Sequence, residues 1–388
     1  MRTITVPLLC SLWLLMGSTG SLRAENSSRA EAVRVASMNV SLYGESAGQV
    51  QARLASGSDA QAIRLAQIIR TIRPEILLLC EIDHEPDAAT LNCFADLYLN
   101  ANKLGIGGDQ SSAIDYPHRW SIPTNTGLIA DVDIDSDGRQ MLPTDAWGFG
   151  VYPGQYAMAV LSRYPIDRDA VRTFQTFRWA DLPDALQPIA PETAAPFYPP
   201  NVWNKLRLSS KNHADVPIKI PIGEGFNQTT KTIHLLASHP TPPVFDGKED
   251  RNGKRNHDEI RFWHDYLSKP SAEYLIDDSG AHGGLSDDAS FVIAGDLNSD
   301  PERGDSLQSA IVGLIEHPRI RDARPTSAGH GISTALFGRR EVRVDYVLPS
   351  RDLTVIDQGV VWPDEGEPLA KAIGASDHRM VWLELQLR

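Results

Sequence analysis

The sequence has few cysteines, a deficit of basic residues and, beyond its first residues, no long apolar run. Its 388 residues include three cysteines, and 37 Lys and Arg face 50 Asp and Glu, for a net charge of −13. A chain this acidic lacks the phosphate attraction that dominates nonspecific nucleic-acid binding. So few cysteines exclude a disulfide-rich scaffold, and no later apolar run is long enough to predict a stable membrane span.

The apolar run near the N-terminus predicts export. Arg2 precedes apolar residues 6–16, and small and polar residues then lead to Ala24. This pattern is typical of a secretory signal peptide over residues 1–24, which is too short for a spanning helix. We therefore expect cleavage after Ala24 and release into a periplasmic or extracellular space.

Two cysteines, Cys80 and Cys93, remain after this processing. An oxidising compartment permits a disulfide between them. The apolar run around Cys80 favours a buried free thiol instead, and both alternatives fit the sequence.

Alternating and periodic apolar residues predict a single layered domain over residues 25–388. Residues 32–40 alternate as a strand, residues 60–74 repeat apolar side chains at helical spacing, and residues 75–83 form a buried strand. Strand, helix, strand is the opening of a layered α/β arrangement. Further segments are predicted as strands at 156–166, 231–238, 292–294, 342–350 and 376–387, and as a helix at 256–267.

Two other segments are predicted as surface insertions. Residues 124–154 are rich in Gly, Asp and Pro, and residues 168–225 are Pro-rich and weakly periodic. Neither has the apolar periodicity that a separate core requires, so we expect both to lie on the surface of the one domain.

Polar side chains recur where the predicted strands end, in the stretch "VIAGDLNSDP" (292–301) and elsewhere. The candidates are Asn39, Glu81, His239, Asp296, Asn298, Asp345, Asp377 and His378. Each alone has a simple structural explanation, such as turn chemistry. Because loops converge over strand ends in layered folds, their recurrence predicts one shared site.

The motifs around these residues resemble the endonuclease/exonuclease/phosphatase superfamily, which includes deoxyribonuclease I. They are "SMNV", "LLLCEID", "LSRYPI", "ASHPTPP", "AGDLNSDP", "VDYVLPS" and "SDHRMVWLEL", in family order. The resemblance implies an α+β fold, a four-layer sandwich of two packed mixed β-sheets flanked by helices. It also implies metal-dependent hydrolysis of a phosphate ester, most readily a phosphodiester attacked by water.

The resemblance implies a magnesium site, with Mn²⁺ as an alternative ion. Glu81 would be the principal ligand, assisted by Asn39 and Asp377, and hard oxygen ligands are those that Mg²⁺ prefers. Several family members carry Asp where this chain has Ser41. That departure weakens the case for Asn39 as a ligand.

The resemblance also implies catalytic roles. Asp296 would hold or deprotonate the attacking water, and Asn298 would donate to the phosphoryl group. His378 would act as general base or bind phosphate, with Asp345 fixing its tautomer. His239 would stabilise the phosphate or protonate the leaving oxygen. Whether Asp296 or the Asp345–His378 pair generates the nucleophile stays open.

A second candidate cation site is the stretch "DVDIDSDGRQ" (131–140). Asp133, Asp135 and Asp137, followed by Gly138, mimic the start of a calcium loop. The twelfth position is Thr144 and not Glu, so an EF-hand is not expected. A structural Ca²⁺ and a solvated acidic turn are both compatible with the sequence.

The substrate is open among nucleic acid, phospholipid and small phosphoester, and fold resemblance does not decide between them. A phosphomonoesterase, or a non-catalytic anion- or calcium-binding protein on the same scaffold, is the alternative. A lipase-like reading of "GDSL" (304–307) would need Ser306 as nucleophile, but no Asp-x-x-His partner follows. No obligatory protein partner is evident.

Overall fold

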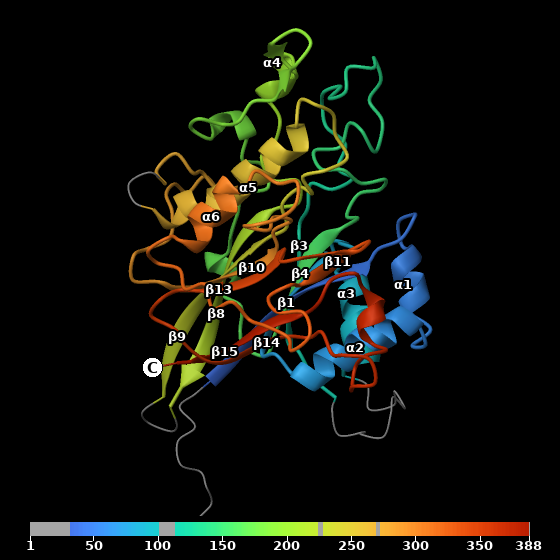
Figure 1. Cartoon of the computed structure of the whole chain (residues 1–388), viewed down its shortest axis with the longest axis vertical. Coiled ribbons are helices and arrows are strands. Elements are labelled where there is room, and N and C mark those ends of the chain that lie inside the picture. Colours follow the sequence, from blue (N-terminus) through green and yellow to red (C-terminus); the bar gives the residue numbers. More distant parts are fainter. Residues whose placement is uncertain (1–31, 101–112, 224–227, 269–271, 388) are drawn as a thin grey trace, which may run out of the picture.

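The computed structural model describes residues 32–100, 113–223, 228–268 and 272–387, and two β-sheets packed face to face form its centre (Figure 1). The first sheet consists of β1 (Ala32–Leu42), β2 (Ile76–Ile82), β3 (His118–Ile122), β4 (Ala157–Ser162), β14 (Thr354–Val360) and β15 (Val381–Gln386). The second consists of β5 (Arg172–Thr173), β8 (His213–Ile222), β9 (Thr229–Ser238), β10 (Ser290–Asp296) and β13 (Asp345–Pro349).

The strand orders make both sheets mixed. The first sheet runs β14-β15-β1-β2-β4-β3 and the second runs β13-β10-β9-β8-β5. Parallel pairing joins β1 to β2 and β9 to β10, whereas the other pairs are antiparallel. Two short hairpins, β6 (Ile189–Ala190) with β7 (Ala195–Pro196) and β11 (Ala335–Phe337) with β12 (Arg340–Val342), lie outside these sheets.

Helices cover both outer faces of the sheet pair. On the first sheet lie α1 (Gln49–Leu54), α2 (Ala60–Ile72) and α3 (Ala89–Phe94), the last continued by a π-helical turn at Ala95–Leu99. On the second lie α5 (Arg251–Leu267) and α6 (Ser309–Ile315), with the one-turn α4 (Pro200–Trp203) beyond them. Short 3-10 turns occur at Arg168–Ala170, Trp179–Asp181 and Ile373–Ala375. The predicted four-layer α+β sandwich is confirmed.

Period-two patterning of β1 explains why its segment is apolar on both faces. Val33 and Val35 face the second sheet, whereas Ala36, Met38 and Val40 face the helices. A strand buried on both sides reads as a nearly continuous apolar run. The same holds for β2, so these two strands form the rigid centre from which site residues project.

The α2 helix begins and ends where the sequence indicates. The Asp59 side chain caps it by accepting a 2.9 Å hydrogen bond from the Ala62 backbone N–H. Arg73 ends it in the left-handed conformation, directly before Pro74. Its buried face, which includes Leu65 and Ile69, packs on the first sheet.

The insertion predicted over residues 168–225 is shorter than expected, and this prediction needs correction. Residues 213–222 form β8, a strand of the second sheet that pairs with β9 along its whole length. Val216, Ile218 and Ile220 alternate into the space between the sheets. Two prolines, Pro217 and Pro221, and the polar residues of its other face hide this pattern in the sequence.

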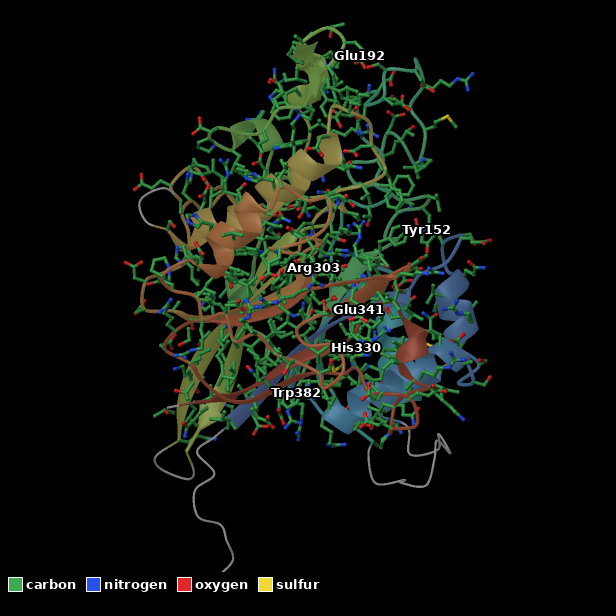
Figure 2. All side chains as sticks on the ribbon, in the orientation of Figure 1. Tyr152, Glu192, Arg303, His330, Glu341 and Trp382 are labelled. Carbon is green, nitrogen blue, oxygen red and sulfur yellow. The ribbon has the colours of Figure 1, made fainter. Side chains whose placement is uncertain are left out.

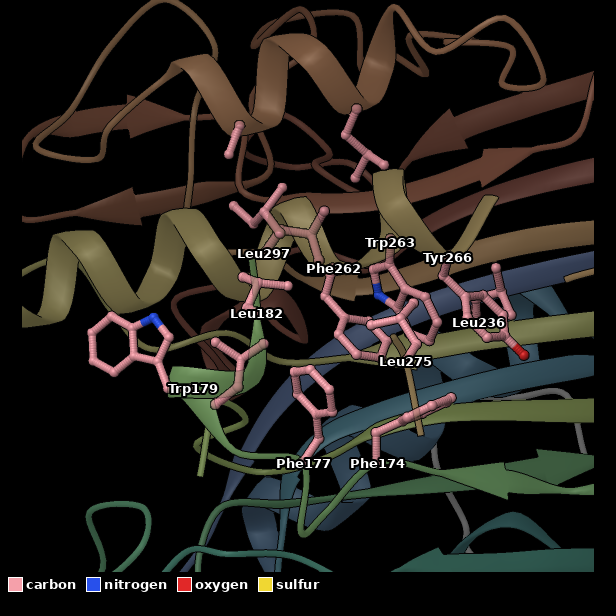
Figure 3. Close-up of a cluster of buried hydrophobic side chains, with 14 of the residues drawn as sticks. Phe174, Phe177, Trp179, Leu182, Leu236, Phe262, Trp263, Tyr266, Leu275 and Leu297 are labelled. Atoms are coloured by element: carbon pink, nitrogen blue, oxygen red, sulfur yellow. The ribbon is translucent and has the colours of Figure 1, made fainter. Parts of the chain in front are cut away.

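Part of the remainder also belongs to the core, whereas residues 189–197 are mostly exposed. Figure 3 shows Phe174, Phe177 and Trp179 in one buried cluster with Phe262 and Trp263 of α5. The segment therefore covers the outer side of the second sheet. The described residues 124–154 form turns and isolated bridges, and Ala130, Val132 and Trp147 pack in the same cluster.

Cys80 and Cys93 are both free. Cys80 lies between the sheets, whereas Cys93 packs among the helices on the opposite face of the first sheet. The sheet itself therefore separates the two thiols, which decides between the two alternatives. The expected signal peptide, residues 1–24, lies outside the described residues. Within the described chain no helix has the length and apolar character needed to cross a membrane.

Candidate functional site

The predicted strand-end residues meet around one buried carboxylate, Asp296, the last residue of β10. Its side chain is within 3.6 Å of three of the others: Asn39 Nδ2 at 3.1 Å, His239 Nε2 at 3.4 Å and His378 Nε2 at 3.6 Å, all measured to Oδ2. Its Oδ1 accepts a 2.9 Å hydrogen bond from the Asn298 backbone N–H. Segments more than 200 residues apart in sequence thus converge on one oxygen.

The strands bend to make this convergence. β1 and β2 each shift register, between Asn39 and Leu42 and between Cys80 and Ile82. Glu81, inside the second bulge, has the left-handed φ of 59°. Such conformations cost about 1–3 kcal/mol in a non-glycine residue and are common where a bulge redirects a side chain at a functional site.

Asp296 is held ionised. It is 1% exposed, and burial alone would raise its pKa. The positive potential of His378 and His239, with the Asn39 amide, outweighs that effect and lowers the pKa below its ordinary value. A permanent carboxylate therefore sits between two imidazoles.

His378 and Asp345 form a second element of the site. The Nδ1 of His378 lies 2.9 Å from Asp345 Oδ2, and both side chains are at most 5% exposed. Burial would lower the pKa of His378, but the carboxylates of Asp345 and Asp296 raise it well above its ordinary value. Burial and the nearby Asp296 charge raise the pKa of Asp345. Nδ1 of His378 donates a hydrogen bond to Asp345. The other ring nitrogen, Nε2, therefore faces Asp296 and the cavity.

His239 stands beside Asp296 with both ring nitrogens buried and without a hydrogen bond to any described residue. Its Nε2 lies 3.9 Å from Glu81 Oε1 as well as 3.4 Å from Asp296. Glu81, His239 and Asp296, which we call the strand-end cluster, each offer a ligand atom within 4.8 Å of the others. Buried polar atoms without a partner are rare, so this cluster fits a bound divalent cation.

The other two predicted metal ligands are placed differently. The Asn39 side chain is engaged at both ends, because Nδ2 donates to Asp296 and Oδ1 accepts from the Ser41 N–H at 3.1 Å. Asp377 is exposed and accepts a 3.3 Å hydrogen bond from the Ser41 hydroxyl. Asn39 therefore orients Asp296. The Asp377 side chain is linked to that of Asn39 through Ser41, whose hydroxyl binds Asp377 and whose backbone N–H binds Asn39.

A cavity of about 520 Å³ opens over this cluster. Glu81, Asp296, Asn298, Asp377 and His378 line one part of it. Although β10 ends at Asp296 and Asn298 has a positive φ of 52°, both side chains still face this cavity. The remaining wall consists of residues from the loops 242–245 and 300–306, together with Ser41, Tyr43, Phe337, Arg340, Val342 and Val344.

Two further residues of the site escaped the sequence analysis. Tyr43 lines the cavity, and burial together with the charges of Glu81 and Asp377 raises the pKa of its hydroxyl. Lys211 is buried directly before β8, where burial lowers its pKa against the opposing pull of Glu259 and Glu81. Recognising β8 as a strand would have made Lys211 another strand-end residue.

The predicted calcium loop forms a separate group, which we call the acidic loop. Asp133, Asp135 and Asp137 bring carboxylate oxygens within 4.8 Å of one another. The loop satisfies much of its own charge, since Asp133 accepts from the Gly138 N–H at 2.8 Å and Asp135 from the Asp137 N–H at 3.1 Å. Calcium binding by this loop stays a prediction.

Comparison with known proteins gives one family and several distant structures. The model of the endonuclease/exonuclease/phosphatase family matches residues 37–378. No curated protein matches the chain. An endonuclease/exonuclease/phosphatase from Beutenbergia cavernae is 18% identical, with a TM-score of 0.49 over 92% of this chain and 72% of that one.

Two further solved structures are similar at a lower level. The beta toxin of Staphylococcus aureus, solved with bound magnesium ions, is 12% identical with a TM-score of 0.43 over 91% of this chain and 99% of that one. A mannosyl-6-phosphatase from Bacteroides thetaiotaomicron is 12% identical with a TM-score of 0.45 over 92% and 100%. Similarity at this level carries no argument about substrate or metal.

Proposed function

Because this chain belongs to the endonuclease/exonuclease/phosphatase family, whose members are metal-dependent phosphoester hydrolases, we propose that it hydrolyses a phosphate ester, most readily a phosphodiester, by attack of water. The observation that carries the proposal is the Asp296 carboxylate, fixed between two imidazoles and beside Glu81 at the floor of a cavity.

Glu81, His239 and Asp296 would hold the cation, which we propose to be Mg²⁺ or Mn²⁺. The donor set is two carboxylates and one imidazole, and Mn²⁺ tolerates the nitrogen ligand better than Mg²⁺ does. When bound, the ion supplies positive charge that polarises the phosphoryl oxygens and offsets the negative charge of the transition state. Asp377 would take part through the Ser41 hydrogen bond or a bridging water.

The proton of the attacking water needs an acceptor in this site. Asp296 remains ionised at all ordinary pH values, and the Nε2 of His378 lies 3.6 Å from it. The Asp345–His378 bond fixes which imidazole nitrogen faces the cavity. A cation bound beside Asp296 would lower the pKa of His378. We propose that Asp296 orients the attacking water by accepting a hydrogen bond and that neutral His378 takes its proton at Nε2, with Asp345 in a positioning role.

The phosphoryl oxygens need donors that stand ready before reaction. The Asn298 side chain lines the cavity and is fixed by a 3.0 Å hydrogen bond from its Nδ2 to the Pro240 carbonyl. Its second amide hydrogen is free to donate to phosphate.

We further propose that the protein acts outside the cytoplasm, which rests on the signal-peptide pattern of residues 1–24. Cell fractionation checks this proposal. When the full-length chain is expressed, the protein recovered from the periplasm or medium should begin at residue 25, as read by N-terminal sequencing.

Steady-state hydrolysis of chromogenic substrates tests the proposed function. Purified protein is assayed on bis(4-nitrophenyl) phosphate, 4-nitrophenyl phosphate and plasmid DNA with Mg²⁺, Mn²⁺, Ca²⁺ or EDTA. We expect the highest kcat/KM on the diester with Mg²⁺ or Mn²⁺, and no hydrolysis of any substrate in EDTA. His378→Ala should abolish hydrolysis while circular dichroism remains that of the native protein. Activity that persists in EDTA would overturn the proposal.

Ser306→Ala separates this proposal from an acyl hydrolase. Ser306 lies on the cavity wall, and its hydroxyl is 2.8 Å from that of Ser299. An acyl hydrolase built on the "GDSL" stretch would lose all activity in this variant, whereas a phosphoesterase would keep most of it.

A further inference from the structure

The cavity has a cationic end that the proposed chemistry does not use. Among the described residues that line the cavity, Arg303 and Arg340 are the only Lys or Arg side chains. Both are exposed. Figure 2 shows Arg303 beside Glu341, the residue that follows Arg340 in β12. In a chain with a net charge of −13, two arginines at the mouth of one cavity require an explanation.

Each arginine has only a weak partner of its own. Arg340 Nη1 lies 3.4 Å from Asp305 Oδ2, and the two side chains are 59% and 64% exposed. Arg303 Nη1 lies 3.4 Å from the Glu341 backbone carbonyl. Exposed pairs of this geometry contribute little to stability, so both guanidinium groups can exchange these contacts for a ligand.

The nearby acidic side chains are mostly committed elsewhere. Both oxygens of Asp300 accept backbone hydrogen bonds, from the N–H groups of Glu302, Arg303 and Arg343 at 2.8–3.0 Å. The carboxylate of Glu341 lies 2.9 Å from the Nδ1 of His330. Among the described carboxylates that line this end of the cavity, Asp305 is therefore the direct competitor for a ligand anion.

Arg340 lies one residue beyond the reacting centre, and Arg303 contacts the backbone of the next residue, Glu341. In the β11–β12 hairpin Phe337 is paired directly with Arg340, which places their Cβ atoms about 5 Å apart. The ring of Phe337 also packs edge-on against His378, with 5.4 Å between ring centroids. From the floor outward the order is thus His378, Phe337 and Arg340, with Phe337 42% exposed between the two polar groups.

We propose that Arg303 and Arg340 form a subsite for a second anionic group on the organic part of the substrate, with Phe337 packed against the carbon skeleton between the two anions. The substrate is then a small phosphoester that carries a further phosphate or carboxylate. This inference rests on the proposed function. Arginine suits such a role because its planar guanidinium binds phosphate and carboxylate through paired hydrogen bonds.

A matched pair of substrates tests this subsite. Thymidine 5′-(4-nitrophenyl phosphate) has one anionic group, whereas its 3′-phosphorylated form differs only in the second phosphate. The measured quantity is the ratio of kcat/KM for the second substrate to that for the first, at low ionic strength. We expect a ratio above 10 for the native protein, carried by KM and not by kcat.

Four variants make the test specific. Arg303→Gln and Arg340→Gln should each lower the ratio about fivefold, and Asp305→Asn should raise it because Arg340 loses its competitor. The control is Arg178→Gln, which removes an equally exposed arginine (55%) that pairs with Asp181 and does not line the cavity. It should leave the ratio unchanged.

The outcomes separate this inference from the proposed function. If both substrates are hydrolysed and the ratio is the same in all four variants, the subsite is overturned and the phosphoesterase proposal stands. If neither is hydrolysed with any metal, the proposed function fails. Binding of thymidine 3′,5′-bisphosphate by calorimetry then still tests the arginines, since Arg303→Gln and Arg340→Gln should weaken it and Arg178→Gln should not. A single-stranded oligonucleotide cleaved with a higher kcat/KM than the bisphosphorylated substrate would overturn the assignment to a small molecule.

Discussion

The strand-end cluster and the acidic loop each bring three potential metal ligands within 4.8 Å of one another, but they are built in different ways. Glu81, His239 and Asp296 come from three strand ends, and two of them are buried to within 2%. The acidic loop comes from one short stretch of chain, 133–137, and is mostly exposed. One group is assembled by the fold and the other by local sequence.

This difference separates a site that is organised before binding from one that is not. The acidic loop turns several of its carboxylate oxygens toward its own backbone N–H groups, as in the bond from Gly138 to Asp133 Oδ2, although Asp133 Oδ1 is buried without a hydrogen bond to a described residue. In the strand-end cluster neither nitrogen of His239 makes a hydrogen bond to a described residue, although Nε2 lies 3.4 Å from Asp296 Oδ2. His239 gains most from a bound ion, because it has no hydrogen bond to break first, whereas Asp296 is held rigid by the hydrogen bonds from Asn39 and Asn298.

The largest expected effect is the loss of catalysis in Asp296→Asn. The change removes the carboxylate on which both imidazoles converge, and it should lower kcat/KM on bis(4-nitrophenyl) phosphate by at least about 10³-fold, or about 4 kcal/mol. The corresponding change in the acidic loop, Asp135→Asn, should alter kcat/KM less than about twofold. An Asp296→Asn protein that keeps a tenth of the native kcat/KM would contradict the proposed difference between the strand-end cluster and the acidic loop.

Metal affinity should show the next largest difference. Glu81→Gln should weaken the tightest Mn²⁺ site by about 100-fold, since one of its charged ligands is lost. Calorimetric titration of metal-free protein measures this change. Asp135→Asn is the control and should leave the tightest site as it was. Equal losses in both variants would mean that the two groups do not differ as proposed.

The His378–Asp345 pair gives a smaller, pH-dependent effect. In metal-free protein, histidine NMR should show His378 titrating well above its ordinary pKa of 6.5, and Asp345→Asn should bring that pKa down. Because the native pKa of His378 is raised, its protonation stabilises the fold below pH 6.5. This stabilisation is lost as the pH rises through the native pKa. The stability difference between native protein and Asp345→Asn should therefore be larger at pH 6 than at pH 10. A His378 pKa of 6.5 or lower in native protein contradicts the proposed pairing.

The smallest effect is expected where the two regions are joined. Tyr152, in the insertion that carries the acidic loop, donates from its hydroxyl to both oxygens of Asp83 at 2.9 and 2.8 Å. Burial raises the pKa of Asp83 from 3.8 to about 7.

A carboxyl whose native pKa is raised loses stability as pH climbs between the unfolded and native values, here from about 4 to about 7. Asp83→Asn should remove this fall, so the unfolding free energy of the variant should improve relative to native protein across that window. Urea denaturation at pH 5 and pH 8 measures the slope. Parallel slopes for the two proteins would contradict the assignment.

Much of this arrangement could be predicted because it depends on local patterns. The strand 75–83 was evident from its apolar run, and Asp296 and His378 from their place at strand ends. β8 was not recognised in the same way. Its apolar residues do alternate, but Pro217 and Pro221 argue against a strand inside a sheet, and the strand forms by pairing with β9. Lys211 was missed with it.

The internal geometry of the site is also not a local property. The contact between Asn39 and Asp296 joins positions 257 residues apart and requires both sheets to be in register. Whether Asn39 binds a metal or orients Asp296 depends on that distance, which no sequence spacing contains. The proposed subsite of Arg303 and Arg340 likewise depends on the β11–β12 hairpin, which contributes Phe337 and Arg340 to the cavity wall.

Anomalous diffraction from a crystal grown or soaked with Mn²⁺ tests the central claim most directly. We predict one strong peak within coordination distance of Glu81, His239 and Asp296, about 2.0–2.3 Å from the ligand atoms. Occupation of the acidic loop alone, or a strand-end cluster without density at saturating Mn²⁺, would contradict it.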